Sequence, residues 1–316
     1  LTSVALFGYA AASRWPAVVA LGVLLGLGGG AIDAALNTYV ATNHGPRTMN
    51  WLHACYGIGA ATGPMIMTTV LGKGLSWQRG YAVVALAQLV LAGSFALTLR
   101  RWPRTSGAAS QTSPDEAAPT VGATLGIAGA RLGIATFFVY AGVEASFGAW
   151  TYTLLTAGRA ASPLQAGAVV SVFWGSLTAG RLVTAFAGGL APVRHLLTGA
   201  VWAVIGGAGL VWLNAGLTST FAGVVLAGVA CGPIFPTLVS VTPARLGATH
   251  AANGVGFQIA AAAIGLSIVP AFVGVVADTA GVETIATLFL LLSLLLGTVH
   301  WLLDKVAPVG ETAATP

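Results

Sequence analysis

The sequence predicts an all-α protein that crosses a membrane many times, and three observations support this prediction. Of its 316 residues, 56% are hydrophobic and only 7% are charged, whereas soluble globular domains carry about 25% charged residues. The mean hydropathy is +0.87. Apolar segments of about 20 residues, the length that crosses roughly 30 Å of hydrocarbon as a helix, recur along the whole chain. Little of the sequence remains for a soluble domain.

The apolar pattern predicts nine complete membrane spans. To within a few residues they cover 17–42, 50–71, 77–99, 125–152, 164–188, 196–213, 219–240, 251–276 and 284–303. Residues 1–12, LTSVALFGYAAA, are typical of the end of a tenth span. The chain opens inside this apolar run, without a methionine or a charged leader, so we expect it to lack its natural N-terminus.

One long polar segment divides the predicted spans into two groups. Residues 100–123, RRWPRTSGAASQTSPDEAAPTVGA, are rich in Pro, Ser, Thr and Ala and have no apolar period, which predicts a linker. Three spans and the remnant of a fourth precede it, and six follow it. We therefore expect an N-terminal half at 1–102 that lacks its first two spans, a linker at 103–123, a C-terminal half at 124–304 and a tail at 305–316.

The basic residues predict the orientation of these spans. If the spans alternate, one side holds Arg47, Arg100, Arg101, Arg104, Arg131, Arg194, Arg245 and Lys305, and the other holds Arg14, Lys73, Arg79 and Arg159. The positive-inside rule then places the linker and the C-terminus in the cytoplasm, with the protein in the inner (plasma) membrane. The basic residues form no continuous patch, which argues against a nucleic-acid partner.

The sequence also contains a weak internal repeat. The run LLGLGGGAIDAALNTYVA, a loop with an Arg and the segment GIGAATGP are echoed by VLAGVACGPIFPTLVSV, a loop with an Arg and AAAIGLSIVP. Gly26 and Gly30 align with Gly228 and Gly232, and the positions of Asp33 and Asn37 hold Phe and Val in the second copy. Duplicated halves are common in secondary transporters. Because the second copy has no polar residue at the two matched positions, the architecture itself does not require the Asp33 and Asn37 pair.

These motifs resemble the major facilitator superfamily, a family of membrane transporters with two six-helix halves. The stretches GGGAIDAALNTYV, WLHACYGIGAATGP and FFVYAGVEASFGAW are similar to the fucose permease branch of sugar:proton symporters. The resemblance implies that about ten of twelve transmembrane helices, the third to the twelfth, are present and that the halves move by alternating access. In that branch an acidic residue four positions before an Asn recurs on the fourth span, and Asp33 and Asn37 fall on those positions.

Arg181 follows Gly180 in the segment WGSLTAGRLVTAFAGGLAPVR, residues 174–194, which contains no acidic residue. We therefore do not expect a gate salt bridge there, and we predict that Arg181 is a gating or packing residue near the cytoplasmic end of its span. We also expect no fixed positive charge near the centre of the membrane. This expectation disfavours organic anions as substrates.

Two of the eight acidic residues, Asp33 and Glu144, lie deep in predicted spans. A carboxylate at mid-membrane costs at least ~2.5 kcal/mol on insertion scales, so each is expected to face a partner or a cavity. On a helical wheel Asp33 shares an arc of about 80° with Gly22, Gly26, Gly30 and Asn37. Such small-residue stripes pack against neighbouring helices. We predict that Asp33 titrates a proton or binds substrate; the alternative is a hydrogen bond that only fixes helix packing.

Glu144 follows Tyr140 by one helical turn, so the phenol and the carboxylate are predicted to lie together. We predict that Glu144 lines a cavity and shares the proton role of Asp33, while Tyr140 offers a hydrogen bond to substrate. The alternative is a structural hydrogen bond between the two side chains.

Four further residues complete the predicted site. Asn37 and His53 are candidates to bind substrate hydroxyl groups, and His53 could also relay a proton. Trp150 could stack against the apolar face of a sugar ring, although Trp also anchors helices at the membrane interface. Gln258 is a further candidate for binding a hydroxyl group.

The predicted function is symport of a small neutral solute, a monosaccharide or polyol, with protons. A proton-coupled exporter of lipophilic compounds or drugs, and a non-transporting membrane receptor or scaffold, remain alternatives. HExxH, GxSxG and a glycine-rich loop with Lys are absent, so we expect no enzyme activity, and the few intramembrane charges argue against an ion channel. The expected partners are substrate, protons and lipid, with no metal or other cofactor, and we expect a monomer.

Overall fold

The computed structural model describes residues 1–99, 119–186 and 192–309, and these residues form helices and short connections without a strand. Within them nine helices exceed 20 residues: α2 (Trp15–Asn43), α3 (Pro46–Gly72), α4 (Trp77–Thr98), α6 (Ala128–Thr153), α7 (Pro163–Phe186), α8 (Val193–Leu213), α9 (Leu217–Ser240), α11 (Ala248–Ala280) and α12 (Thr284–Val306). Eight of them are long and apolar enough to cross a membrane, and α3 has the length as well. The chain is a multi-pass membrane protein, as predicted.

Each predicted span corresponds to one long helix, and residues 1–12 correspond to α1 (Thr2–Ala11). The remaining elements are short: α5 (Val121–Gly126), the π-helix η3 (Leu154–Gly158) that continues α6, and α10 (Thr242–Leu246). The span predicted at 125–152 is interrupted at its start, because Ile127 has extended backbone and separates α5 from α6. The span predicted at 251–276 extends by several residues at both ends as α11.

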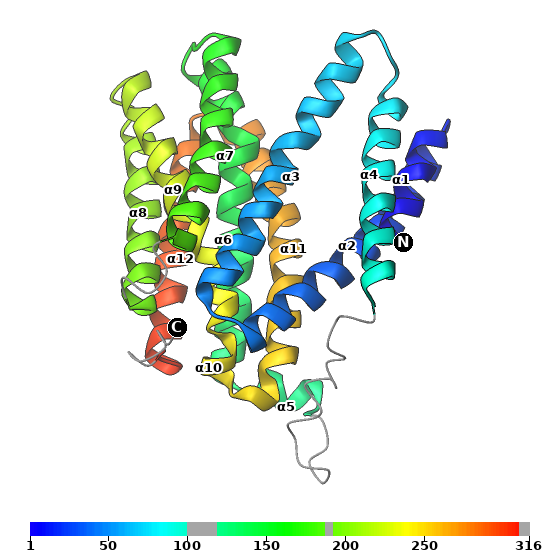
Figure 1. Ribbon diagram of the computed structural model, residues 1–316. Coiled ribbons are helices and arrows are strands. Elements are labelled where there is room, and N and C mark those ends of the chain that lie inside the picture. Colours follow the sequence, from blue (N-terminus) through cyan, green and yellow to red (C-terminus); the bar gives the residue numbers. More distant parts are fainter. Residues whose placement is uncertain (100–118, 187–191, 310–316) are drawn as a thin grey trace. The chain divides into compact units, whose positions relative to one another are not determined.

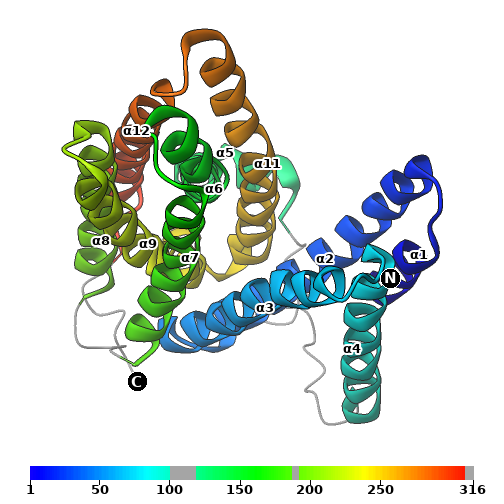
Figure 2. The same cartoon turned by 90° about the horizontal axis from the view of Figure 1, so that it is seen from above.

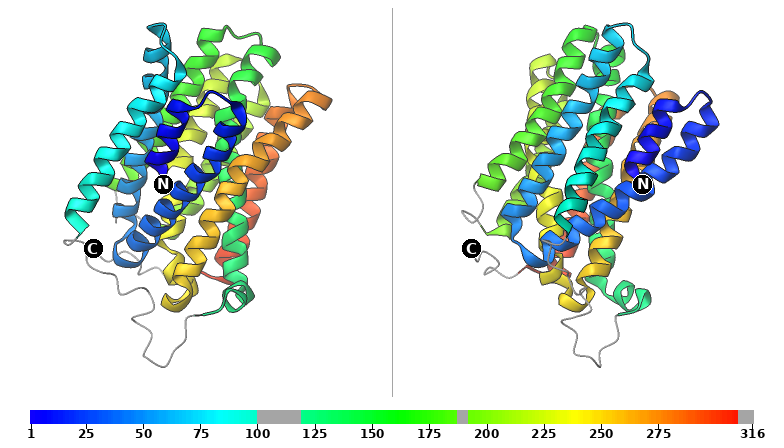
Figure 3. Two further views of the ribbon diagram at one scale, coloured as in Figure 1. Left: turned by 90° about the vertical axis from the view of Figure 1, so that its right-hand side faces the viewer. Right: turned by 45° about the vertical axis from the view of Figure 1, so that its right-hand side comes forward.

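The helices fall into two compact units, and the N-terminal unit comprises Leu1–Leu36 and Ile58–Ala117. In it α1 and α2 form an antiparallel hairpin (Figure 3), in which a Cβ atom at Gly28 would lie 2.9 Å from the Leu1 Cβ atom. No described atom lies within 4 Å of a Cβ position at Gly26 or Gly30. In the described part of α2, Gly28 makes a close approach, and the approach predicted for Gly26 and Gly30 stays a prediction.

The C-terminal unit comprises Asn37–Gly57 and Ala118–Pro316. Its main helix pairs are α6 with α11, α8 with α9, and α7 with α9, and all three pairs can be followed in Figures 1 and 2. The unit includes the end of α2 and the first part of α3. The half boundary predicted at residue 102 and most of the predicted linker lie outside the described residues and stay predictions.

Glycines allow these helices to touch backbone to backbone. A Cβ atom at Gly180 on α7 would lie 2.1 Å from the Val229 carbonyl oxygen on α9. A Cβ atom at Gly265 on α11 would lie 2.2 Å from the Phe138 carbonyl oxygen on α6. Lipid tails are as apolar as the helix surfaces, so the hydrophobic effect does not drive helices together inside the membrane. Close packing of this kind is therefore a main source of helix association.

Candidate functional site

A polar cluster lies in the core of the C-terminal unit, around Glu144. Glu144 is near the middle of the continuous Ala128–Gly158 span. The hydroxyl group of Tyr140, one turn earlier on α6, contacts the Glu144 carboxylate and lies 2.7 Å from the Cys231 carbonyl oxygen on α9. Tyr140 is fully buried. The contact predicted between Tyr140 and Glu144 is confirmed.

Arg181 on α7 joins this cluster as a buried cation. Its Nη2 atom lies 3.7 Å from Glu144 Oε2. Its Nε atom donates to the Gly232 carbonyl oxygen at 3.4 Å, and Nη1 donates to the His53 carbonyl oxygen at 3.3 Å. All three contacts are longer than the 2.7–2.9 Å typical of a charge-assisted hydrogen bond. The guanidinium group therefore contacts three acceptors and does not form a close ion pair with the carboxylate alone.

Two expectations about Arg181 are wrong. We expected no acidic partner because none occurs in its own segment, but the partner is Glu144, which comes from α6. We also expected no positive charge near the membrane centre, but the guanidinium group lies 3.7 Å from mid-span Glu144, and Arg181 is 3% exposed. Arg181 itself does lie in the last part of α7, five residues before Phe186, as predicted. Helix packing brings together residues that are distant in the sequence.

Asn37 and His53 form a second buried pair. His53 Nε2 lies 2.9 Å from Asn37 Oδ1, and both side chains are buried. Because an amide oxygen only accepts, the ring nitrogen is the donor in this arrangement. The His53 ring also packs against the ring of Phe235, with centroids 4.9 Å apart, and Phe235 packs in turn against Phe137. The sequence indicated both residues of the pair but gave no sign that they bind each other.

Trp150 and Gln258 use their polar atoms in contacts between helices. Trp150 Nε1 donates to the Pro270 carbonyl oxygen at 2.8 Å, which joins α6 to α11. Gln258 Oε1 accepts from the Thr242 hydroxyl group at 2.8 Å, which joins α11 to α10. Their predicted contacts with substrate remain predictions.

Asp33 lies on α2, one turn before Asn37, and its side chain is partly exposed. By its contacts Asp33 belongs to the N-terminal unit, whereas Asn37 belongs to the C-terminal unit. Its role as a proton carrier stays a prediction.

Two further charge clusters lie at opposite ends of the C-terminal unit. At one end Asp304 on α12 accepts from Arg194 on α8 at 2.5 Å and from Arg245 on α10 at 3.3 Å. Burial lowers the pKa of Arg245 below its ordinary value, and Asp304 opposes that shift. At the other end the guanidinium group of Arg159 binds both oxygens of Glu283 at 3.1 Å. Sequence reasoning missed these pairs because each joins different helices.

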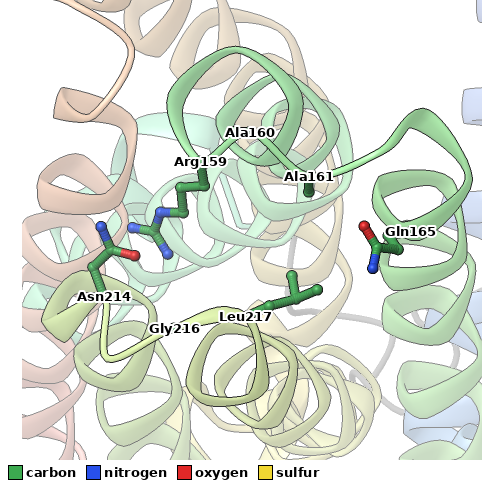
Figure 4. A pocket seen from close by; sticks show the side chains of 7 residues that line it. All are labelled: Arg159, Ala160, Ala161, Gln165, Asn214, Gly216 and Leu217. Carbon is green, nitrogen blue, oxygen red and sulfur yellow. The ribbon is translucent and has the colours of Figure 1, made fainter.

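Beside Arg159 lies a cavity of about 300 Å³. Figure 4 shows its lining residues, Arg159, Ala160, Ala161, Gln165, Asn214, Gly216 and Leu217. Ala160 and Asn214 both have left-handed backbone, with φ values of 51° and 48°. The cavity shares no lining residue with the cluster around Glu144, so it is separate from the predicted site. In the described part of the chain, no group of three His, Cys, Asp or Glu side chains is arranged to hold a metal ion.

Comparison with solved structures identifies the fold of the chain. No family model and no curated protein matches the sequence. Among solved structures, a variant of the fucose:proton symporter of E. coli superposes with a TM-score of 0.76 at 15% identity, covering 96% of this chain and 80% of that chain. The chain has the major facilitator fold.

Two other structures with the major facilitator fold are also similar to this chain. The fucose symporter in its outward conformation gives a TM-score of 0.72 at 16% identity, covering 96% of this chain and 82% of that chain. The human organic anion transporter MFSD10 gives a TM-score of 0.72 at 17% identity, covering 94% and 74%. The predicted resemblance to the fucose permease branch is confirmed at the level of the fold.

Proposed function

We propose that this chain transports a small neutral solute rich in hydroxyl groups, a monosaccharide or polyol, together with protons. The major facilitator fold supports secondary transport by alternating access of two helical halves. The similar structures include a fucose:proton symporter, which supports sugar as the substrate class and the proton as the coupling ion.

The observation that carries the proposal is the number of protons available around Tyr140. The phenol has one proton, yet its oxygen contacts two acceptors, the Glu144 carboxylate and the Cys231 carbonyl oxygen. A proton on Glu144 removes this conflict, because the carboxyl group then donates to the phenol while the phenol donates to Cys231. The arrangement fits a carboxyl group that takes up and releases a proton during transport.

The other residues have the following proposed roles. Asp33 shares proton binding with Glu144, and Arg181 acts as a gate through its bonds to α3, α6 and α9. Asn37, His53 and Tyr140 offer hydrogen bonds to substrate hydroxyl groups. Trp150 and Gln258 would reach a substrate in a state in which their present helix contacts have opened.

Uptake by purified protein in proteoliposomes tests the proposal. A panel of monosaccharides and polyols is supplied with and without an inward proton gradient. We expect Glu144→Gln and Asp33→Asn to abolish gradient-driven accumulation while exchange of labelled for unlabelled substrate continues. Asp278→Asn, which alters an exposed carboxylate near the end of α11, is the matched control and should still accumulate substrate. Accumulation that persists in both intramembrane variants would refute the proton roles.

A small organic anion is a second candidate substrate class. Arg181 supplies a buried cation, and one similar structure is described as an organic anion transporter. In that case a proton on Glu144 would free Arg181 to bind the anion. Competition distinguishes the candidates: protection by millimolar sugars supports the first, protection by small carboxylates supports the second, and protection by micromolar lipophilic cations supports an exporter. Absence of any flux would support a receptor or scaffold.

We further propose that the protein acts as a monomer in the plasma membrane with its C-terminus in the cytoplasm. The excess of basic residues on the linker side supports this orientation. Proteolysis of a C-terminal tag in intact and permeabilised cells tests it, and cleavage in intact cells would reverse the orientation.

A further inference from the structure

Two prolines in α9 leave two backbone carbonyl groups without their usual helical donors. In the segment GPIFP, Pro233 and Pro236 lie inside the helix. Proline has no N–H group, so the carbonyl groups four residues earlier, those of Val229 and Gly232, receive no hydrogen bond from these positions. In the hydrocarbon region no water replaces the missing donor, so a neighbouring helix has to satisfy such a group.

Both carbonyl groups face α7, but they meet different groups there. The Val229 carbonyl oxygen lies against the backbone of Gly180, at the closest approach of the two helices. The Gly232 carbonyl oxygen accepts a hydrogen bond from Arg181 Nε at 3.4 Å. Two prolines three residues apart thus expose one carbonyl group to helix packing and the other to the guanidinium group beside Glu144.

We propose that Pro236 positions Arg181 for proton coupling. The Gly232 carbonyl group, which Pro236 leaves without its helical donor, competes with Glu144 for the guanidinium group and keeps Nη2 at 3.7 Å from the carboxylate. A direct two-point pair between Arg181 and Glu144 would hold the carboxylate in its charged form. The shared arrangement holds the cation away from such a pair. This inference rests on the proposed function of Glu144.

The first test is the pH profile of uptake. Pro236→Ala supplies an N–H group that binds the Gly232 carbonyl oxygen within the helix, so Arg181 moves toward Glu144. Because a closer cation favours the charged carboxylate, we expect the pH of half-maximal uptake to fall by about one unit. Pro233→Ala is the matched control, since it restores a donor to Val229, which does not bind Arg181. A profile that is unchanged in Pro236→Ala, or equally shifted in Pro233→Ala, would overturn the inference.

The second test does not depend on transport. Melting temperatures are measured for both proline variants in the native background and in a Glu144→Gln, Arg181→Met background, which removes both charges together. We expect the effect of Pro236→Ala to differ by more than about 2 °C between the backgrounds, whereas that of Pro233→Ala should be the same in both. Equal effects of Pro236→Ala on the melting temperature in the two backgrounds would refute the inference. If the native protein shows no uptake but this coupling is present, the proposed function fails and the positioning by Pro236 stands.

Discussion

The two copies of the internal repeat place glycines at matched positions, but the glycines do different things. On α9 a Cβ atom at Gly228 would lie 2.7 Å from the Phe173 carbonyl oxygen, and one at Gly232 would lie 2.6 Å from that of Leu177. On α2 the matched Gly26 and Gly30 have no described atom within 4 Å of a Cβ position. Glycines four residues apart therefore allow a helix to approach another closely, but whether it does so depends on the position of the neighbouring helix.

The copies also supply polar groups of different origin. On α2 the polar groups are side chains, and Asn37 binds His53. On α9 the matched positions hold Phe235 and Val239, and the polar groups are backbone carbonyls, such as that of Cys231, which lies 2.7 Å from the Tyr140 hydroxyl group. The second copy of the repeat can thus contribute hydrogen-bonding groups to a site although it has no polar side chain at the two matched positions.

Gly232→Leu is expected to have the largest effect on this comparison. The new side chain would overlap the Leu177 carbonyl oxygen and the Arg181 backbone nitrogen, which would lie 2.6 and 2.7 Å from its Cβ atom. Because backbone atoms cannot rotate away, we expect a loss of about 3 kcal/mol or more. Melting temperature and the yield of monodisperse protein measure this loss. Gly199→Leu is the control, since Gly199 on α8 has no described atom within 4 Å, and similar melting of both variants would break the comparison.

Asn37→Val makes α2 resemble α9 and should have the next largest effect. It removes the acceptor 2.9 Å from His53 Nε2 and leaves a buried N–H group without this partner, which costs about 1–3 kcal/mol. Thermal unfolding measures the loss. Adding His53→Phe removes the stranded donor as well and should restore most of the stability. If the double variant is no more stable than the single one, the hydrogen bond is not the source of the effect.

Tyr140→Phe tests the backbone contribution of α9 and should cost less stability. The variant keeps the buried ring but removes the hydroxyl group between Glu144 and the Cys231 carbonyl oxygen. We expect a loss of about 1 kcal/mol in stability, together with a fall of roughly tenfold in proton-driven uptake, equivalent to about 1.4 kcal/mol. Tyr152→Phe, on the exposed part of the same helix, is the control. Uptake at the native rate in Tyr140→Phe would contradict the role of the hydroxyl group.

Gly30→Ala should have the smallest effect. No described atom lies within 4 Å of the new methyl group, and alanine favours a helix over glycine by about 1 kcal/mol. We therefore expect the melting temperature to stay the same or to rise slightly. A clear fall would mean that Gly30 makes a close contact in the protein under the conditions of the measurement.

The sequence predicted those parts of the molecule that depend on local periodicity. Each of the nine spans corresponds to a long helix, because apolar length alone defines a membrane helix. The contact between Tyr140 and Glu144 was predictable for a similar reason, since side chains one turn apart share a helix face. The hypothesis of a neutral substrate had weaker support, because it used the absence of a central cation and Arg181 supplies one.

Contacts between helices were not predictable in the same way. Glu144 with Arg181, and Asp304 with Arg194, join residues on different helices, and no spacing rule connects them. One signal could have been found in the sequence: GPIFP fixes which carbonyl groups lack a helical donor. Counting four residues back from Pro236 leads to Gly232, although the identity of its partner, Arg181, required the packed structure.

The ion pairs at the two ends of the C-terminal unit have a mechanical consequence. Arg159 binds Glu283, the Thr220 hydroxyl group at 2.6 Å and the Val211 carbonyl oxygen at 2.8 Å, so it clamps the ends of several helices together. Asp304 clamps α8, α10 and α12 at the opposite end. A bundle fastened at both ends resists bending and shearing. We therefore expect this unit to move as one body during the proposed transport cycle.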